Sequence, residues 1–188
     1  LKSCKNLDSD ISIELPELLI KNHNYRNNIN NKNIDSKRNN NLNPNDNPNI
    51  VLILIDDLGL TDIQAYGGEI STPNMDSLAS EGMIFTNYHT TPECAPSRAM
   101  LLTGMDNHNT GIPMIPEVLP WEYRNTPGYE GYLRDDALTI AEILKPAGYR
   151  SYMTGKWHLA FGGHETAALP YNRGFDKTFI LDATGGNN

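Results

Sequence analysis

The sequence has 188 residues, enough for one domain of ordinary size, and 38% of them are hydrophobic. Its formal net charge of −8 argues against a general nucleic-acid-binding protein, because such proteins present a basic face to the phosphate backbone. We therefore expect no nucleic-acid partner. No apolar run approaches the about 20 residues that are needed to cross a bilayer, so we also expect no transmembrane segment.

The first part of the chain differs in composition from the rest, because residues 22–49 are dominated by asparagine. Polar tracts of this kind bury too little apolar surface to balance the entropy lost on ordering. We therefore predict a disordered segment or linker over residues 1–48, with its most solvated part at 22–47, and an ordered domain over residues 49–188.

Cys4 lies close to the start of the chain, as in a processed and lipid-anchored bacterial lipoprotein. Lys2 fits such a processing site poorly, so we favour the interpretation of Cys4 as an ordinary surface cysteine. On either interpretation we expect a periplasmic or secreted protein.

The first predicted elements of the ordered domain are a strand, a helix and a second strand. The apolar, β-branched run at 50–55 is typical of a strand buried on both faces of a parallel sheet. A helix is predicted over 73–81, with Thr72 as its cap and Gly82 at its end. Residues 83–88 indicate another strand.

Helices and strands continue to alternate in the second half of the chain. Helices are predicted over 95–103, ending at Gly104, and over 137–145, capped by Asp136. Strands are predicted over 150–153 and 179–181. The alternation predicts an α/β fold with a mostly parallel central sheet flanked by helices.

Charged residues follow two of the predicted strands directly. In parallel sheets, ligands collect at the carboxyl ends of strands, and Asp56, Asp57 and Lys156 all fall there. Adjacent carboxylates repel one another, and a hard cation such as Ca²⁺ or Mg²⁺ would relieve that repulsion. The alternative for the aspartate pair alone is a helix cap followed by a solvated turn.

A second candidate site is the stretch from Cys94 to Gly104. A cysteine at a helix N-terminus, with Arg98 one turn later, suggests a reactive thiol or an anion site. The alternative is a structural cysteine and an arginine on a solvated face, and these features alone slightly favour that alternative.

The motifs together resemble the sulfatase family. Cys94, Pro96 and Arg98, followed by Leu-Thr-Gly, match the motif whose cysteine that family converts to formylglycine. The stretch 148–158, which ends Gly-Lys-Trp-His, resembles the second family motif, with Ser151 in place of the usual threonine. The segments 56–59 and 172–176 resemble two further family segments in the same order.

This resemblance implies an alkaline phosphatase-like fold and hydrolysis of sulfate esters, either small aryl sulfates or sulfated carbohydrates. A maturation enzyme would convert Cys94 to formylglycine, whose hydrate attacks sulfur with one hydroxyl and releases sulfate through the other. The implied catalytic residues are Cys94, Arg98, Lys156 and His158. The implied metal is Ca²⁺, with Mg²⁺ as the alternative, at Asp56, Asp57 and the modified residue 94.

Other features limit or compete with this interpretation. Sulfatases carry further metal ligands later in the chain than residue 188, so we expect this sequence to be a fragment or a partial gene product that holds half of the metal site. The alternatives are a phosphonate monoester or phosphodiester hydrolase of the same superfamily and a fragment that acts only through interactions. Trp157 is interpreted as a packing residue, and His89 and His164 as surface or structural residues.

Overall fold

The structure is a computed structural model that describes residues 47–124, 126–161 and 163–182. Cys4 and nearly all of the predicted N-terminal segment lie outside these residues. The α-helices are α2 (Pro73–Glu81), α3 (Cys94–Thr103), α4 (Asn107–Thr110) and α5 (Ile140–Leu144). Seven short 3-10 helices accompany them in the described ranges, at Leu60–Asp62, Gln64–Tyr66, Pro116–Val118, Trp121–Tyr123, Lys145–Ala147, Thr166–Ala168 and Pro170–Asn172.

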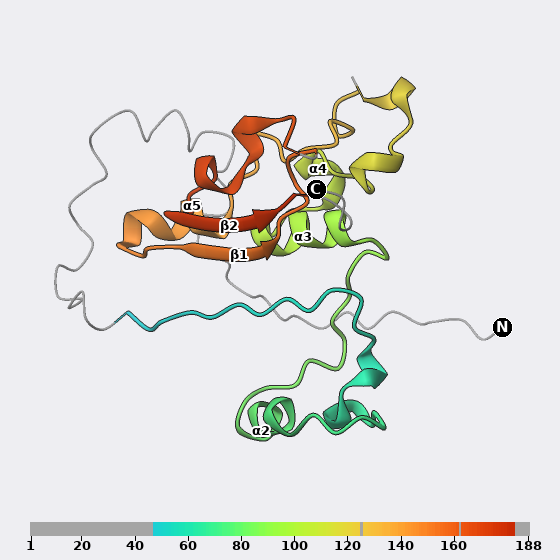
Figure 1. Ribbon diagram of the computed structural model, residues 1–188, viewed down its shortest axis with the longest axis vertical. Coiled ribbons are helices and arrows are strands. Elements are labelled where there is room, and N and C mark those ends of the chain that lie inside the picture. The colour runs from blue at the N-terminus through green and yellow to red at the C-terminus, as the bar shows by residue number, and fades with distance from the viewer. Residues whose placement is uncertain (1–46, 125, 162, 183–188) are drawn as a thin grey trace, which may run out of the picture. The chain divides into compact units, whose positions relative to one another are not determined.

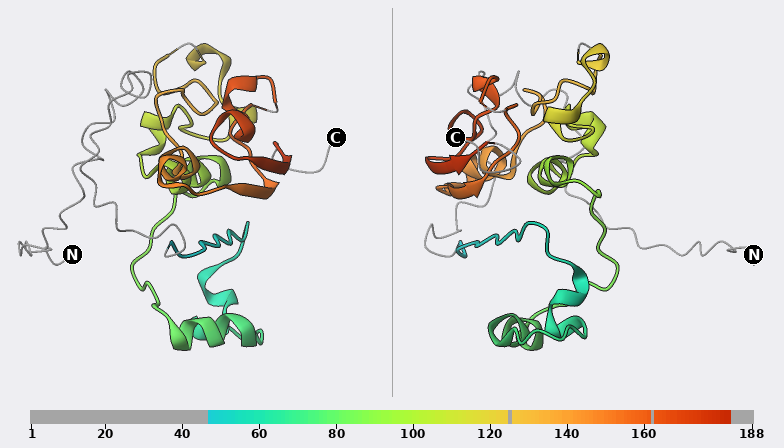
Figure 2. Two further views of the ribbon diagram at one scale, coloured as in Figure 1. Left: turned by 90° about the vertical axis from the view of Figure 1, so that its left-hand side faces the viewer. Right: turned by 45° about the vertical axis from the view of Figure 1, so that its right-hand side comes forward.

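The two strands of the described residues, β1 (Tyr152–Lys156) and β2 (Lys177–Leu181), pair in parallel. The register runs from Tyr152 opposite Lys177 to Lys156 opposite Leu181. Figures 1 and 2 show them side by side. The parallel pairing was predicted, and both strands are shifted or extended relative to their predicted limits. Lys156 is the last residue of β1, at the carboxyl end where ligands are expected.

Two of the predicted helices form where the sequence places them. α2 begins after Thr72 and ends before Gly82, although the Thr72 hydroxyl accepts from the Gln64 N–H and donates to the Asp76 carboxylate instead of accepting from a backbone N–H of the helix. α3 ends at Gly104, which has a φ of 68°. A residue without a β-carbon is favoured in that left-handed conformation.

The predicted helix over 137–145 is shorter than expected. α5 begins at Ile140, and its cap is Thr139, whose hydroxyl accepts from the Glu142 N–H while the Glu142 carboxylate accepts from the Thr139 N–H. Asp136 instead forms an ion pair with Arg134 at 2.7 Å. This reciprocal capping box determines the start of the helix, and it outcompetes the cap that we predicted.

The predicted strands over 50–55 and 83–88 are wrong for the described residues. Neither segment forms a strand, since 50–55 has no regular secondary structure and 83–88 bends at Thr86 and Asn87, and the apolar side chains of 50–55 are exposed, from 43% at Ile55 to 80% at Val51. A strand exists only through backbone hydrogen bonds to a partner, and the described residues pair no strand with either segment. Asp56 and Asp57 therefore follow an exposed segment without regular secondary structure instead of a buried strand.

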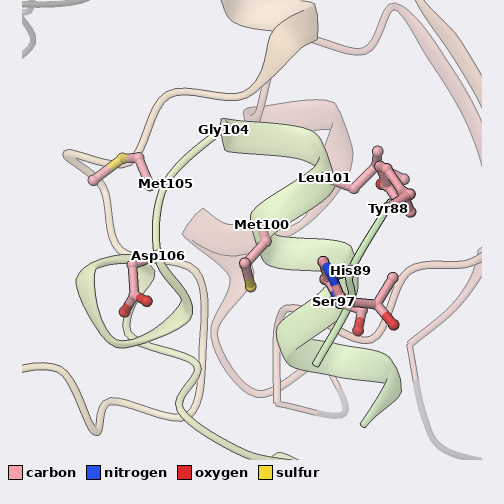
Figure 3. Close-up of a pocket in the computed structure, with 9 residues that line it drawn as sticks. Tyr88, His89, Ser97, Met100, Leu101, Gly104, Met105 and Asp106 are labelled. Atoms are coloured by element: carbon pink, nitrogen blue, oxygen red, sulfur yellow. The ribbon is translucent and has the colours of Figure 1, made fainter. Parts of the chain in front are cut away.

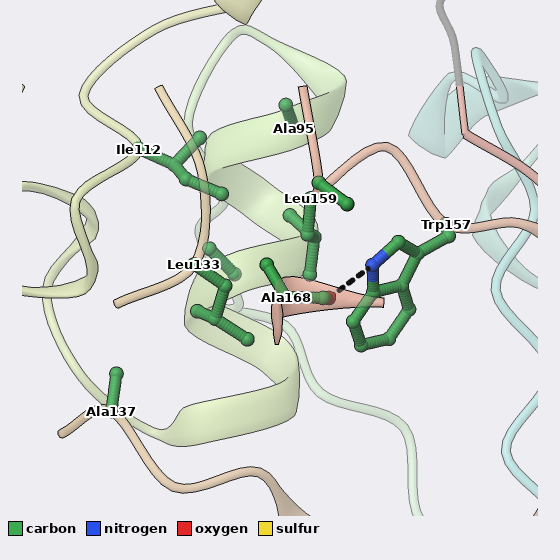
Figure 4. Packing of buried hydrophobic residues seen from close by; sticks show 9 residues of the cluster. Ala95, Ile112, Leu133, Ala137, Trp157, Leu159 and Ala168 are labelled. Atoms are coloured by element: carbon green, nitrogen blue, oxygen red, sulfur yellow. Dashed lines mark hydrogen bonds between the residues drawn. The ribbon is translucent and has the colours of Figure 1, made fainter. Parts of the chain in front are cut away.

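The core packs around one face of α3. Ala95 and Ala99 of α3 contact a cluster that includes Leu133, Trp157 and Leu159, all with no exposed surface (Figure 4). The Trp157 indole N–H donates to the Ala168 carbonyl at 2.9 Å, so the polar edge of this ring is satisfied inside the core. The interpretation of Trp157 as a packing residue is confirmed.

Arg173 links α5 to the loop before it. The guanidinium is 1% exposed and donates to the carbonyls of Leu133, Arg134 and Ala137 and to the Glu142 carboxylate. The segment 172–176 thus has a structural function here. No helix of the described residues is long and apolar enough to cross a membrane.

Candidate active site

Cys94 is the first residue of α3, and the loop before it is fixed by side-chain hydrogen bonds. The Glu93 carboxylate accepts from the Ile115 N–H at 2.7 Å. The Ser97 hydroxyl donates to the Thr91 carbonyl at 3.0 Å. These contacts hold the start of the helix, where the dipole favours a negative charge. They therefore set the position of the Cys94 side chain.

Three charged side chains form a cluster near this helix start. Asp56 Oδ2 lies 2.8 Å from Lys156 Nζ and 3.1 Å from Arg98 Nη2. Arg98 also donates through Nη1 to the Lys156 carbonyl at 2.7 Å and is only 7% exposed. Three segments distant in the sequence are therefore joined at one point, although Asp56 does not follow a strand as the predicted sheet rim requires.

The charges of this cluster stabilise one another. The hydrogen bond from Lys156, assisted by the Arg98 charge, holds the pKa of Asp56 below its usual value, although partial burial opposes this. Burial acts against the charged form of Lys156, but its hydrogen bonds to Asp56 and Cys94 outweigh burial and raise its pKa. The cluster thus sets two basic side chains, Lys156 and Arg98, against the single carboxylate of Asp56.

His158 completes the group around residue 94. Its Nδ1 lies 3.3 Å from Cys94 Sγ, and its Nε2 lies 2.9 Å from Glu117 Oε2 and 3.1 Å from Oε1. The ring is fully buried. Its backbone has a φ of 63°, which is uncommon for a residue with a β-carbon and costs about 1 kcal/mol or more.

The strained backbone of His158 is held by bonds on both sides. Before it, the Trp157 N–H donates to the Leu181 carbonyl at 2.7 Å. After it, the Asp182 carboxylate accepts from the N–H groups of Leu159 and Ala160 at 2.9 and 3.1 Å. Such over-determined strain is typical of functional sites, where it fixes a side chain in one position.

Sequence reasoning missed Glu117 and Asp182. Asp182 directly follows β2, so the rule that polar residues collect at the carboxyl ends of parallel strands could have found it. Glu117 lies in a short 3-10 helix 41 residues before His158, outside any recognised motif. The sequence carries no signal for it that we recognise.

Asp57 follows Asp56 in sequence but joins none of the contacts described above. With the described residues, its side chain forms no hydrogen bond or ion pair, and its backbone has a φ of 61°. The two aspartates offer oxygen donors of the kind that Ca²⁺ and Mg²⁺ prefer. The donors thus fit a hard divalent cation in kind, although no group of three or more His, Cys, Asp or Glu side chains in the described ranges is arranged so that it could hold a metal ion.

Both histidines that we interpreted as non-catalytic are exposed. His89 lines a separate cavity of about 470 Å³ on another side of α3, together with Tyr88, Ser97, Met100 and Asp106 (Figure 3). Neither Cys94 nor His158 lines this cavity. The group around residue 94 is therefore distinct from it.

The geometry defines a class of site. A helix N-terminus, two cations and a buried imidazole converge on one potential nucleophile, and this arrangement suits attack on a small anionic group.

Residues 48–187 match the family model described as Sulfatase, and the chain belongs to the sulfatase family. That family implies an alkaline phosphatase-like α/β fold, of which the structure shows helices and one parallel strand pair.

Individual relatives support the assignment. The chain is 44% identical over 144 residues to an uncharacterized sulfatase of Schizosaccharomyces pombe, covering 75% of this chain and 26% of the relative. It is 44% identical over 141 residues to an arylsulfatase of Klebsiella aerogenes, with coverages of 73% and 29%. It is 45% identical over 132 residues to human arylsulfatase A, with coverages of 69% and 24%. The chain thus spans about a quarter of the length of these relatives.

Proposed function

We propose that this chain carries part of the active site of a sulfuric ester hydrolase whose nucleophile is a formylglycine formed from Cys94. The observation that carries the proposal is the meeting of three segments distant in sequence: the one that carries Asp56, α3 with residue 94 and Arg98, and the end of β1 with Lys156 and His158. Family membership and the arylsulfatase relatives favour a sulfate ester as the substrate class.

An unsatisfied donor supports the modification of Cys94. Arg98 Nε is buried and has no hydrogen-bond partner among the described residues. Arg98 lies one helical turn after residue 94, on the same face of α3. A thiol is a weak acceptor, whereas the hydroxyl oxygens of hydrated formylglycine accept strong hydrogen bonds. The modification would therefore supply the partner that this buried N–H lacks.

Each residue around position 94 has a proposed function. Arg98 orients the hydroxyls of residue 94, and Lys156 contacts the sulfuryl oxygens and stabilises the charge that develops on them. His158 accepts a proton from residue 94 when sulfate is released. Formylglycine supplies a geminal diol, so that one hydroxyl attacks sulfur and the other allows release.

A divalent cation, Ca²⁺ or alternatively Mg²⁺, would bind at Asp56 and Asp57 and beside residue 94. It would polarise the sulfuryl group and favour the ionised nucleophile. Asp56 suits this function because its pKa is held low, so the carboxylate is available to a cation at neutral pH. Lys156, whose ammonium group lies 2.8 Å from Asp56 Oδ2, would then be the side chain that contacts the sulfuryl oxygens.

Three further parts of the proposal rest on the resemblance. These are a catalytic domain over residues 49–188, a maturation enzyme that acts on Cys94, and a periplasmic or secreted location. The substrate is a small aryl sulfate or a sulfated carbohydrate, and a relative named N-acetylgalactosamine-6-O-sulfatase, from Bacteroides thetaiotaomicron, is 40% identical over 151 residues.

Paired substrates test the reaction class. We expect the matured full-length gene product to hydrolyse an aryl sulfate with a larger kcat/KM than the matching aryl phosphate diester or phosphonate monoester. The measurement is release of the same chromogenic alcohol from all three esters. Preference for either phosphorus ester would identify a phosphonate or phosphodiester hydrolase, and turnover of none of them would favour a chain that acts only through interactions.

A further inference from the structure

The imidazole of His158 is contacted by one side chain at each nitrogen. Nδ1 faces residue 94, and Nε2 faces both carboxylate oxygens of Glu117 at 2.9 and 3.1 Å. The ring has no exposed surface, so these two contacts control where its proton lies. Neither family motif includes Glu117.

The Glu117 carboxylate fixes the tautomer of His158. An ionised carboxylate can only accept hydrogen bonds, so Nε2 must carry a proton in order to donate to it. A neutral imidazole has only one N–H, and Nδ1 is then left as an unprotonated acceptor. This is the nitrogen that faces residue 94, so the carboxylate orients the basic nitrogen toward the nucleophile.

The backbone around Glu117 is itself held in place. Pro116 is buried and begins the short 3-10 helix that carries Glu117. The Arg124 guanidinium donates to the carbonyls of Pro116 and Leu119, at 2.9 and 3.3 Å, on either side of Glu117. Arg124 also stacks 4.3 Å from the centre of the Phe161 ring, three residues after His158. The carboxylate and the imidazole are therefore connected by a second route, which limits their relative motion.

We propose that Glu117 is the positioning residue of this active site, holding His158 as the Nε2–H tautomer with Nδ1 directed at residue 94. This inference rests on the proposed function. In the release step, Nδ1 takes the proton of the free residue-94 hydroxyl: an N–H bond forms as the O–H bond breaks, the electron pair left on oxygen forms the aldehyde C=O, and the C–O bond to sulfate breaks so that sulfate leaves. The resulting imidazolium faces the Glu117 carboxylate, and once sulfate has left, water that enters beside the partly exposed residue 94 takes the proton from Nδ1. Similar carboxylate–histidine pairs increase activity by orienting a ring and selecting its tautomer.

The tautomer can be measured without any turnover. In the full-length gene product labelled with ¹⁵N-histidine, two-bond ¹H–¹⁵N spectra at one neutral pH distinguish the two neutral forms of His158. We expect the Nε2–H form in the unaltered protein. The Nδ1–H form there would overturn the proposal, whether or not the protein hydrolyses any sulfate ester.

The variant Glu117→Gln tests the same contact by substitution. Its amide can donate to Nε2 as well as accept from it, so we expect the Nδ1–H form to appear and kcat to fall about 100-fold while KM changes little. Glu122→Gln, at an exposed position five residues later, is the matched control and should leave the His158 tautomer and kcat unchanged. If Glu117→Gln does not fold, Glu117→Asp replaces it. This variant keeps the negative charge, so we expect the Nε2–H form to be retained and kcat to lie between that of the unaltered protein and that expected for Glu117→Gln. An unchanged kcat and tautomer in Glu117→Gln would also overturn the proposal.

Discussion

Cys94→Ala in the full-length gene product is expected to lose turnover of an aryl sulfate by at least ~10⁴-fold, as when other enzymes lose their nucleophile. The alanine cannot be converted to formylglycine, so no hydroxyl faces sulfur. Arg98, Lys156 and His158 would remain in place, because their mutual contacts do not involve the thiol except through one hydrogen bond each from Lys156 and His158. The measurement is kcat/KM for the two proteins under identical conditions.

The folded state should survive this change. Cys94 is partly exposed at the first residue of α3, and replacing it by alanine removes a single sulfur atom. We expect the free energy of unfolding to change by less than about 1.5 kcal/mol. Cys4→Ala is the matched control, since it removes the other cysteine of the chain and should leave turnover unchanged. Retained activity in Cys94→Ala would place the nucleophile elsewhere.

Cys94→Ser separates attack from release. Its single hydroxyl can attack sulfur, but the resulting serine sulfate has no second hydroxyl through which sulfate could leave. We therefore expect at most one turnover and a stable sulfated peptide by mass spectrometry. Sustained turnover by this variant would show that water hydrolyses the covalent ester and that the geminal diol is unnecessary.

Metal removal is expected to have the second large effect. Exhaustive chelation of the full-length gene product should reduce activity to that of Cys94→Ala, and added Ca²⁺ should restore it. The physical reason is that a sulfate ester is an anion, and the excess positive charge of Lys156 and Arg98 over Asp56 is only one unit. Mg²⁺ should restore less, because it demands more regular geometry than Ca²⁺. Full activity after chelation would refute metal assistance.

Asp57→Asn tests the site more finely. Asparagine tolerates the left-handed backbone of residue 57, with its φ of 61°, so the substitution removes charge without new strain. We expect the Ca²⁺ concentration needed for rescue to rise about tenfold. Glu69→Gln removes one charge at another exposed position and should not change the rescue.

For the 188-residue chain alone, calorimetry should show weak Ca²⁺ binding or none, and tight stoichiometric binding would mean that we have misplaced the site.

The helices were more predictable from the sequence than the strands, for a physical reason. α2 and α3 depend on neighbours within a few residues, such as Pro73 at the first position of α2 and Gly104 after the end of α3. A strand depends on a partner that sequence pattern does not reveal, so the apolar run at 50–55 predicted a strand that the described residues do not form. Even α5 was misplaced by three residues, because the Thr139–Glu142 capping box outcompetes Asp136.

In the candidate site too, residues within a motif were predictable from the sequence, whereas contacts made by distant segments were not. Motif spacing identified Cys94, Arg98, Lys156 and His158, and the structure brings them together with Asp56. It could not find Glu117, which reaches His158 only through the folding of a loop 41 residues away. The left-handed backbone of His158 was equally unpredictable. It depends on hydrogen bonds from the residues on either side of it to Leu181 and Asp182, at the end of the neighbouring strand β2.

The proposed mechanism depends most directly on the chemical state of residue 94. Mass spectrometry of the tryptic peptide that contains it, from full-length protein made in a host with the maturation enzyme, decides the matter. We predict a peptide whose mass corresponds to an aldehyde in place of the thiol and which reacts with a hydrazide probe, while Arg98→Lys, which disrupts the Cys-x-Pro-x-Arg motif, retains the thiol. An unmodified Cys94 in every molecule of an active preparation would contradict the account.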